Sequence, residues 1–215
     1  MKQKTASDIA AIERVATRLQ IVEPDARAAL IGVLHVRELA RGEYLLRSGE
    51  RALFIGILLS GLLREHFVTK RGVERTKSFI LPMQLTGSLA DLLSPEPARA
   101  FIVAEKPSRL VVAPYASVRA FETRYADFRS HGQRVAERLV LAKAEREYEL
   151  LCLDAEERYA AFLQRYPELD GQVADRHVAS YLGMTPVHLS RLRRRRRQPA
   201  TRTTSALAGT RGRRT

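Results

Sequence analysis

The chain has 215 residues, of which 45% are hydrophobic and 28% are charged. This composition is normal for a folded soluble protein of one or two domains. Cys152 is the single cysteine, which excludes an intramolecular disulfide and an iron–sulfur cluster held by about four thiolates of one chain. No apolar run approaches the ~18 residues of a membrane span, and the N-terminus lacks the apolar core of a signal peptide. We therefore expect a cytoplasmic protein without a membrane partner.

The positive charge is concentrated at the C-terminal end. The formal net charge is +13, and residues 191–215 contain ten arginines and no acidic residue. Only +3 is left for the first 190 residues, so the body of the protein is nearly neutral. This asymmetry indicates a polyanionic partner, with DNA or RNA preferred to a membrane surface. The alternative is a solvated basic tail without a partner, and composition does not separate the two.

The first 113 residues combine two helical segments with a β-rich region. Apolar residues recur at helical spacing over residues 6–19, and a second helix is predicted after Pro24. Turn glycines then divide the sequence, at Gly42, Gly49, Gly61 and Gly72. We expect separate strands for the apolar runs at residues 44–46, 53–59, 62–68, 77–81, 101–105 and 110–113. Strands with turn signals roughly every 8–12 residues predict a barrel or sandwich.

A long helix is predicted from Tyr125 to Leu153. This segment contains no proline, and its apolar and small residues recur in steps of three and four, at Phe128, Gly132, Val135, Leu139 and Ala142. The stripe packs either against the chain's own β-rich region or against the same helix of a second copy, and charged residues interrupt it after Ala142. Cys152 lies in an apolar run, which favours a buried packing residue over a redox switch.

The most informative segment covers residues 175–195. It follows a helix that begins at Asp154, where an Asp-x-x-Glu sequence has the spacing of a capping box. Two short helices are predicted around a turn at Gly183, because a tight turn there needs a positive φ. Thr185 is a good N-cap for the second helix, and Pro186 suits its first position. The pattern is that of a helix-turn-helix.

The second helix of this pair, over residues 186–196, has two different faces. Leu189 and Leu192 lie on the side predicted to be buried, and a basic side is left for a major groove about 12 Å wide. Arg191 is the candidate for bidentate recognition of guanine, whereas residues 193–197 are expected at phosphates. The predicted DNA-binding residues are Thr185, Pro186, Val187, His188, Ser190, Arg191, Arg194 and Arg195. The alternative is an ordinary helical hairpin with a charged face.

Taken in order, these segments resemble the Crp/Fnr superfamily of bacterial regulators over residues 10–195. RGEYLLRSGE and ILLSGLLREHFVTKRGVERTKSFILP resemble its β-roll, MQLTGSLADLLSPEPARAFIVAE its effector-pocket segment, AEERYAAFLQRYPEL the helix after its dimer helix, and VASYLGMTPVHLSRLRR its helix-turn-helix. The resemblance implies an α+β fold: an N-terminal double-stranded β-helix (a cyclic-nucleotide-binding-like jelly roll), a long dimerisation helix and a C-terminal winged helix. A wing between Pro167 and Asp175 would be minimal.

The resemblance also divides the chain into parts. They are a sensor domain with N-terminal helices at residues 1–124, a dimerisation helix at 125–153, a helix-turn-helix domain at 154–197, and a basic tail at 198–215. The tail has no hydrophobic periodicity, so we expect it to be disordered. The implied partners are double-stranded DNA, a second copy of the chain in a homodimer, and RNA polymerase.

The effector pocket departs from the nucleotide-binding pattern of this superfamily. Nucleotide binders have a glycine followed by an acid that holds the ribose, and an arginine followed by Ser or Thr that holds the phosphate. The matching pairs here are Gly87 with Ser88, and Arg99 with Ala100. Because losing a charged hydrogen bond costs ~1.5–3 kcal/mol, cyclic AMP is a doubtful effector. Arg99 either binds a small anionic effector or pairs with an internal acid such as Asp91.

An enzyme is not predicted. The five histidines show no metal-ligand spacing, and no nucleophile or phosphate-binding motif is present. His177 is interpreted as structural, whereas His188 fits a phosphate contact and a structural role equally. The predicted function is a dimeric, DNA-binding transcription regulator. The alternatives are an RNA- or ribosome-associated protein that binds through its arginine tail, and a small-molecule-binding protein with a degenerate DNA element.

Overall fold

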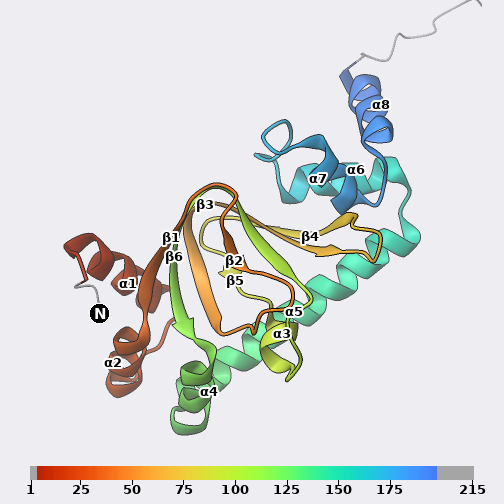
Figure 1. The fold of residues 1–215 in the computed structure, drawn as a ribbon. Coiled ribbons are helices and arrows are strands. Elements are labelled where there is room, and N and C mark those ends of the chain that lie inside the picture. The colour runs from red at the N-terminus through yellow and green to blue at the C-terminus, as the bar shows by residue number, and fades with distance from the viewer. Residues whose placement is uncertain (1–3, 198–215) are drawn as a thin grey trace, which may run out of the picture.

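The computed structural model describes residues 4–197 (Figure 1). Helix α1 (Ala6–Arg18) and helix α2 (Pro24–Val33) come first, as predicted. A capping box starts α1: the Thr5 hydroxyl accepts the Asp8 N–H, and the Asp8 carboxylate accepts the Thr5 N–H. The buried apolar faces of both helices pack on the β-rich region that follows.

Six antiparallel strands form that region, and they make the predicted jelly roll. They are β1 (His35–Leu39), β2 (Tyr44–Leu46), β3 (Phe54–Val68), β4 (Glu74–Ile80), β5 (Leu85–Thr86) and β6 (Phe101–Pro114). The strand order is β1-β6-β3-β4, while β2 also pairs with β6 and β5 with β3. The curled sheet encloses a core of aliphatic side chains, including Leu58, Leu63, Ile102 and Leu110. The roll therefore closes around its own hydrophobic interior.

Four of the predicted strands are wrong in their boundaries, because they form two long strands. The runs at 53–59, from residue 54 on, and at 62–68 belong to β3, and residues 101–105 and 110–113 belong to β6. Gly61 lies within β3 at a φ of 95°, and the pairing of β3 with β6 shifts register around it. A Cβ at Gly61 would lie 2.4 Å from the carbonyl oxygen of Pro107 in β6. The glycine marks a bend shared by two strands rather than a turn between strands.

Helix α3 (Leu89–Leu93) lies between β5 and β6 of the roll. Two further helices, α4 (Tyr115–Arg124) and α5 (Ala126–Cys152), connect the roll to the C-terminal region. In Figure 1, α5 runs diagonally along the roll from α4 to the C-terminal helices. At its start the predicted stripe faces the chain's own domain: Phe128 is buried in the core below α1 and α2, and Val135 is partly buried. This part of the stripe therefore packs against the chain's own β domain, which is one of the two predicted alternatives.

The prediction that Cys152 is buried is wrong. The thiol is exposed at the end of α5, and the preceding Leu150 and Leu151 are exposed as well. The apolar run that suggested a core position therefore lies on the surface of this chain.

The C-terminal region consists of α6 (Ala155–Arg165), α7 (Asp175–Leu182) and α8 (Pro186–Arg197). The predicted capping box at Asp154 is confirmed, since its carboxylate accepts the N–H groups of Glu156 and Glu157. Residues 166–174 form turns without a strand, so the minimal wing expected there is not found in this segment. The basic tail, residues 198–215, lies outside the described residues.

Candidate nucleic-acid interface

The turn between α7 and α8 has the geometry that the sequence predicts. Gly183 ends α7 in the left-handed conformation, with φ 67° and ψ 34°. Thr185 caps α8, because its hydroxyl accepts the N–H of His188 at 3.2 Å. Ala179 is fully buried beside this turn, where a larger side chain would hold the two helices apart. The element is a pair of crossed helices around a tight turn, as in a helix-turn-helix.

The two faces of α8 also separate as predicted. Leu189 and Leu192 are buried in a core cluster with α6 and α7. All eight residues predicted to contact DNA are exposed, namely Thr185, Pro186, Val187, His188, Ser190, Arg191, Arg194 and Arg195. Arg191 therefore points away from the protein core. The exposed face combines arginine guanidinium groups with hydroxyl and apolar groups. Such groups are the ones that recognise base edges in the major groove.

Arg193 is not available for a phosphate, which corrects the expectation for the run at residues 193–197. Its guanidinium donates to Asp170 at 2.6 Å and to Asp175 at 2.5 Å, and its Nε donates to the Tyr159 hydroxyl at 3.3 Å. These contacts join α8 to α7 and to the segment after α6. Arg196, on the same side of the helix, lies over the ring of Tyr159. Both arginines serve the fold of the C-terminal helices.

The C-terminal helices are not a separate body, because they share an aromatic core with the β-roll. Phe79 of β4 is 2% exposed. Its ring centroid lies 5.8 Å from that of Tyr166, 5.7 Å from that of Tyr181 and 6.3 Å from that of Phe162. These are the separations of favourable offset and edge-to-face aromatic pairs. A strand of the roll thereby holds α6 and α7.

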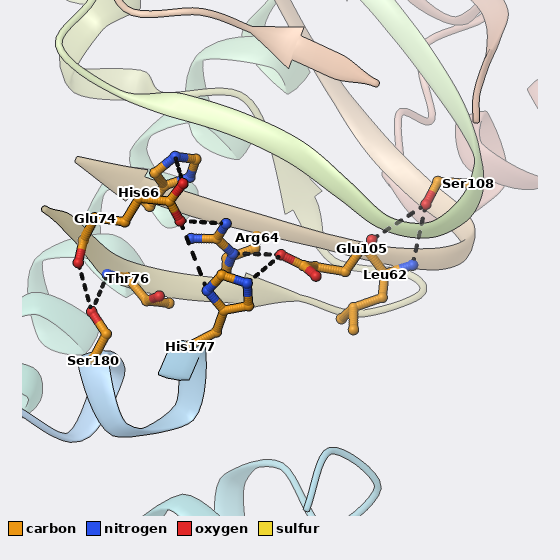
Figure 2. Close-up of polar contacts among 9 residues, drawn as sticks. All are labelled: Leu62, Arg64, His66, Glu74, Thr76, Glu105, Ser108, His177 and Ser180. Carbon is orange, nitrogen blue, oxygen red and sulfur yellow. Dashed lines mark hydrogen bonds and ion pairs between the residues drawn. The ribbon is translucent and has the colours of Figure 1, made fainter. Parts of the chain in front are cut away.

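A polar cluster also links the strands of the roll to α7 (Figure 2). Arg64 of β3 is the centre: its guanidinium pairs with Glu105 at 2.5 Å and with Glu74 at 2.9 Å. His177 of α7 approaches the same two carboxylates, at 3.8 Å from Glu74 and 3.7 Å from Glu105. His66 lies 3.8 Å from Glu74 on the other side. One buried arginine thus links β3, β4, β6 and, through the shared carboxylates, α7.

The protonation state of the cluster follows from its burial. Burial lowers the pKa of His66 to about 4, and the positive charge of Arg64 adds to this effect. Burial and Arg64 also lower the pKa of His177, although Glu105 opposes them. Both rings are therefore uncharged at neutral pH. In this fold, the structural role predicted for His177 is contact with the β-roll.

Ser180 adds a hydrogen-bonded bridge on the other side of α7. Its hydroxyl accepts the N–H of Thr76 at 2.9 Å and donates to the carbonyl oxygen of Glu74 at 3.2 Å. The first helix of the helix-turn-helix is therefore fixed to β4 by a hydroxyl as well as by the aromatic core and the polar cluster. Nothing local in the sequence indicates this contact, since its partners lie more than 100 positions apart.

The end of α5 is joined to α6 through a buried carboxylate and to α7 through Arg146. Glu149 accepts from Arg146 on its own helix at 2.8 Å and from Arg165 of α6. Arg146 also lies over the ring of Tyr181, 4.1 Å from its centroid, and donates to the Tyr181 carbonyl oxygen. Two of the charged residues that interrupt the apolar stripe of α5, Arg146 and Glu149, thus contact α6 and α7.

The predicted effector-pocket residues lie around α3. Gly87 has a φ of 112°, and a Cβ there would lie 2.9 Å from the carbonyl oxygen of Phe54. Ser88 is buried, whereas the Arg99 side chain is exposed. The backbone N–H groups of Arg99 and Ala100 donate to the Asp91 carboxylate at 3.1 and 3.2 Å. Asp91 thus meets the Arg99 backbone and not its guanidinium.

Asp91 supplies an internal anion to this pocket. Its burial disfavours the charged form, but hydrogen bonds from Ser88 and from the two backbone N–H groups outweigh this and lower its pKa. Nearby, the Lys77 ammonium pairs with Glu65 at 2.7 Å. The backbone N–H groups of Arg99 and Ala100 and the Lys77 ammonium therefore already have carboxylate partners.

Comparison with known proteins agrees with this description. Residues 36–125 match the family model of the cyclic nucleotide-binding domain. No curated protein is similar to the chain at the level of sequence. No helix in residues 4–197 is both long and apolar enough to cross a membrane. The N-terminal part of the chain is thus a cyclic-nucleotide-binding-like β-roll.

Solved structures extend the likeness to the C-terminal helices. FixK2 from Bradyrhizobium japonicum is 21% identical with a TM-score of 0.63, over 76% of this chain and 84% of that chain. A proposed regulator of the crp/fnr family from Eubacterium rectale is 15% identical with a TM-score of 0.66, over 82% and 84%. The c-di-GMP responsive regulator CLP from Xanthomonas campestris is 12% identical with a TM-score of 0.64, over 81% and 92%. The chain has the fold of Crp/Fnr regulators.

Proposed function

We propose that this protein is a dimeric transcription regulator, not an enzyme, and that it binds double-stranded DNA through α8. The observation that carries the proposal is the exposed basic face of α8, with Ser190, Arg191 and Arg194, after the left-handed turn at Gly183. Its fold is one found among transcription regulators. An exposed guanidinium on such a helix suits a bidentate contact with guanine.

A second copy of the chain would bind along α5. The large exposed apolar residues of this helix include Val140, Leu141, Tyr148 and Leu151, and Leu151 is 76% exposed. Leu141, Tyr148 and Leu151 recur at steps of seven and three, so they lie on one face of the helix. This face is different from the stripe that packs against the roll. Pairing two such faces would bury them and place two α8 helices about a twofold axis.

The effector of this regulator would not be cyclic AMP. The ribose-binding acid is replaced by Ser88, and Asp91 holds the backbone donors of Arg99 and Ala100. A cyclic phosphate would have to displace this carboxylate and overcome its negative charge. RNA polymerase is the expected protein partner of a regulator, and the cytoplasm is its expected location.

The test is a selection of duplexes bound by the purified chain from fragmented genomic DNA. We expect a palindrome with half-sites about 34 Å apart, as a twofold protein requires. Recovery of no shared sequence, together with tighter binding of RNA, would overturn the proposal. A chain that ends at residue 197 should retain the sequence preference.

Two matched variants then assign the contacts of α8. Arg191→Ala should weaken the selected site by about tenfold or more and leave random DNA almost unaffected. Arg195→Ala, an exposed change on the same helix, should weaken both duplexes alike and reduce the salt dependence. Equal losses on both duplexes in Arg191→Ala would reassign this residue to a phosphate contact.

A further inference from the structure

A large apolar cavity lies outside the predicted effector pocket. This cavity of about 410 Å³ lies between α1 and α2, the sheet, α3, α4 and the start of α5. Ile57 and Val111 line it, whereas their neighbours Leu58 and Leu110 belong to the interior of the roll. Adjacent residues of a strand point to opposite faces. The cavity therefore lies on the face of the sheet that is turned away from the roll's interior.

The inner wall of this cavity is hydrocarbon. It is made by side chains from several elements, including Val15 of α1, Leu30 of α2, Val111 of β6 and Phe128 of α5. A ligand with buried polar groups would lose its hydration there without gaining hydrogen bonds. The volume lies within the roughly 300–1,000 Å³ of small-molecule sites. The wall suits an alkyl chain and not a nucleotide.

The rim of the cavity is polar and positively charged. It includes Arg119, Glu122, Arg129 and His131. Glu122 pairs with Arg119, and burial lowers the pKa of His131, with nearby arginines adding to the effect, so this ring is uncharged. Within residues 4–197, Arg129 has no ion pair and supplies a net positive charge at the mouth. Charge complementarity favours an anionic head group beside a hydrocarbon tail.

We propose that this cavity binds a single-chain amphiphile with a carboxylate head, the tail lying against Val111 and Phe128 and the head at Arg129. This site goes beyond the proposed regulatory function and does not rest on it, because binding is measured on the full chain without DNA. Residues of α5 line the cavity, and α5 is the helix that runs from the roll to the C-terminal helices (Figure 1).

The test is a fluorescence titration of the full chain with dansyl-labelled undecanoic acid. The chain has no tryptophan, so the dansyl signal is free of protein emission from that source. We expect saturable binding that laurate displaces, with dodecanol about tenfold weaker because it lacks the charge. Absence of saturable binding would overturn the proposal. Equal displacement by laurate and dodecanol would overturn the head-group assignment.

Variants connect the signal to the cavity. Val118→Phe adds an aromatic ring to a partly exposed wall residue of α4 and should weaken the probe at least tenfold. Val73→Phe, the same change at an exposed position outside the cavity, should leave binding unchanged. Arg129→Gln, a surface change that leaves the core intact, should weaken laurate about tenfold and leave dodecanol unaffected. Wild-type affinity for laurate in both Val118→Phe and Arg129→Gln would overturn the site.

Discussion

Replacing Glu149 by glutamine would test the contact between α5 and the C-terminal helices α6 and α7. The Glu149 side chain is 3% exposed and accepts from Arg146 and Arg165. Removing one member of a buried ion pair costs roughly 3–5 kcal/mol, since the remaining charges stay buried. The Arg165 side chain is 36% exposed, so water compensates part of the loss. We therefore expect Glu149→Gln to lower the free energy of unfolding by about 3 kcal/mol, the lower end of that range.

The assay is urea denaturation at neutral pH, with far-ultraviolet circular dichroism as the signal. Glu147→Gln provides the matched control, because Glu147 is exposed on the same helix. An exposed change of this kind should stay within about 0.5 kcal/mol of the unaltered chain. If the two variants lost the same stability, the buried carboxylate would not hold α5 to α6 and α7, and the reasoning would be refuted.

Three further predictions concern single positions. Acid should destabilise the chain through His66, whose pKa is lowered to about 4 in the fold from 6.5; this stabilisation is complete above about pH 6.5 and is lost as the pH falls towards 4. Urea midpoints should then depend less on pH in His66→Gln, and an unchanged dependence would contradict the assignment. Arg193→Ala should lower the urea midpoint, whereas Arg194→Ala should weaken DNA binding alone. If the two variants had equal urea midpoints, Arg193 would be reassigned to a phosphate contact. Gly61→Ala should cost about 2 kcal/mol or more, because its φ is 95° and a Cβ would lie 2.3 Å from the Ser108 hydroxyl; unaltered thermal stability would show that the bend can relax.

The helix-turn-helix is predictable from sequence because its signals are local. Gly183 is placed by the conformation of one turn, and Thr185 caps a helix that starts at the next residue. The faces of α8 follow from helical periodicity over a few residues. The jelly roll is predictable for a related reason, since turn glycines and short apolar runs alternate along it. The boundaries fail at Gly61, where the same residue type makes a bend inside a strand.

The contact between the roll and the C-terminal helices could not be predicted from the sequence. Arg64 and His177 come together only after three strands and α7 have packed, and neither has a neighbour in sequence that indicates the other. Glu149 interrupts an apolar stripe and so suggests solvent, although it is buried with its arginine partners. Arg193 belongs to an arginine run, but its helical phase turns it towards Asp170. Long-range pairing decides each of these positions.

The aromatic cluster around Phe79 determines whether the chain can be cut into independently folding parts. Cutting the chain between α5 and α6 would leave bare rings on both fragments, on Phe79 in one and on Phe162 and Tyr181 in the other. The C-terminal helices are therefore not an exchangeable module on a linker, and they are expected to unfold together with the roll in one cooperative transition. A displacement of β4 would reach α7 directly, through packed rings, without passing along the connecting helix.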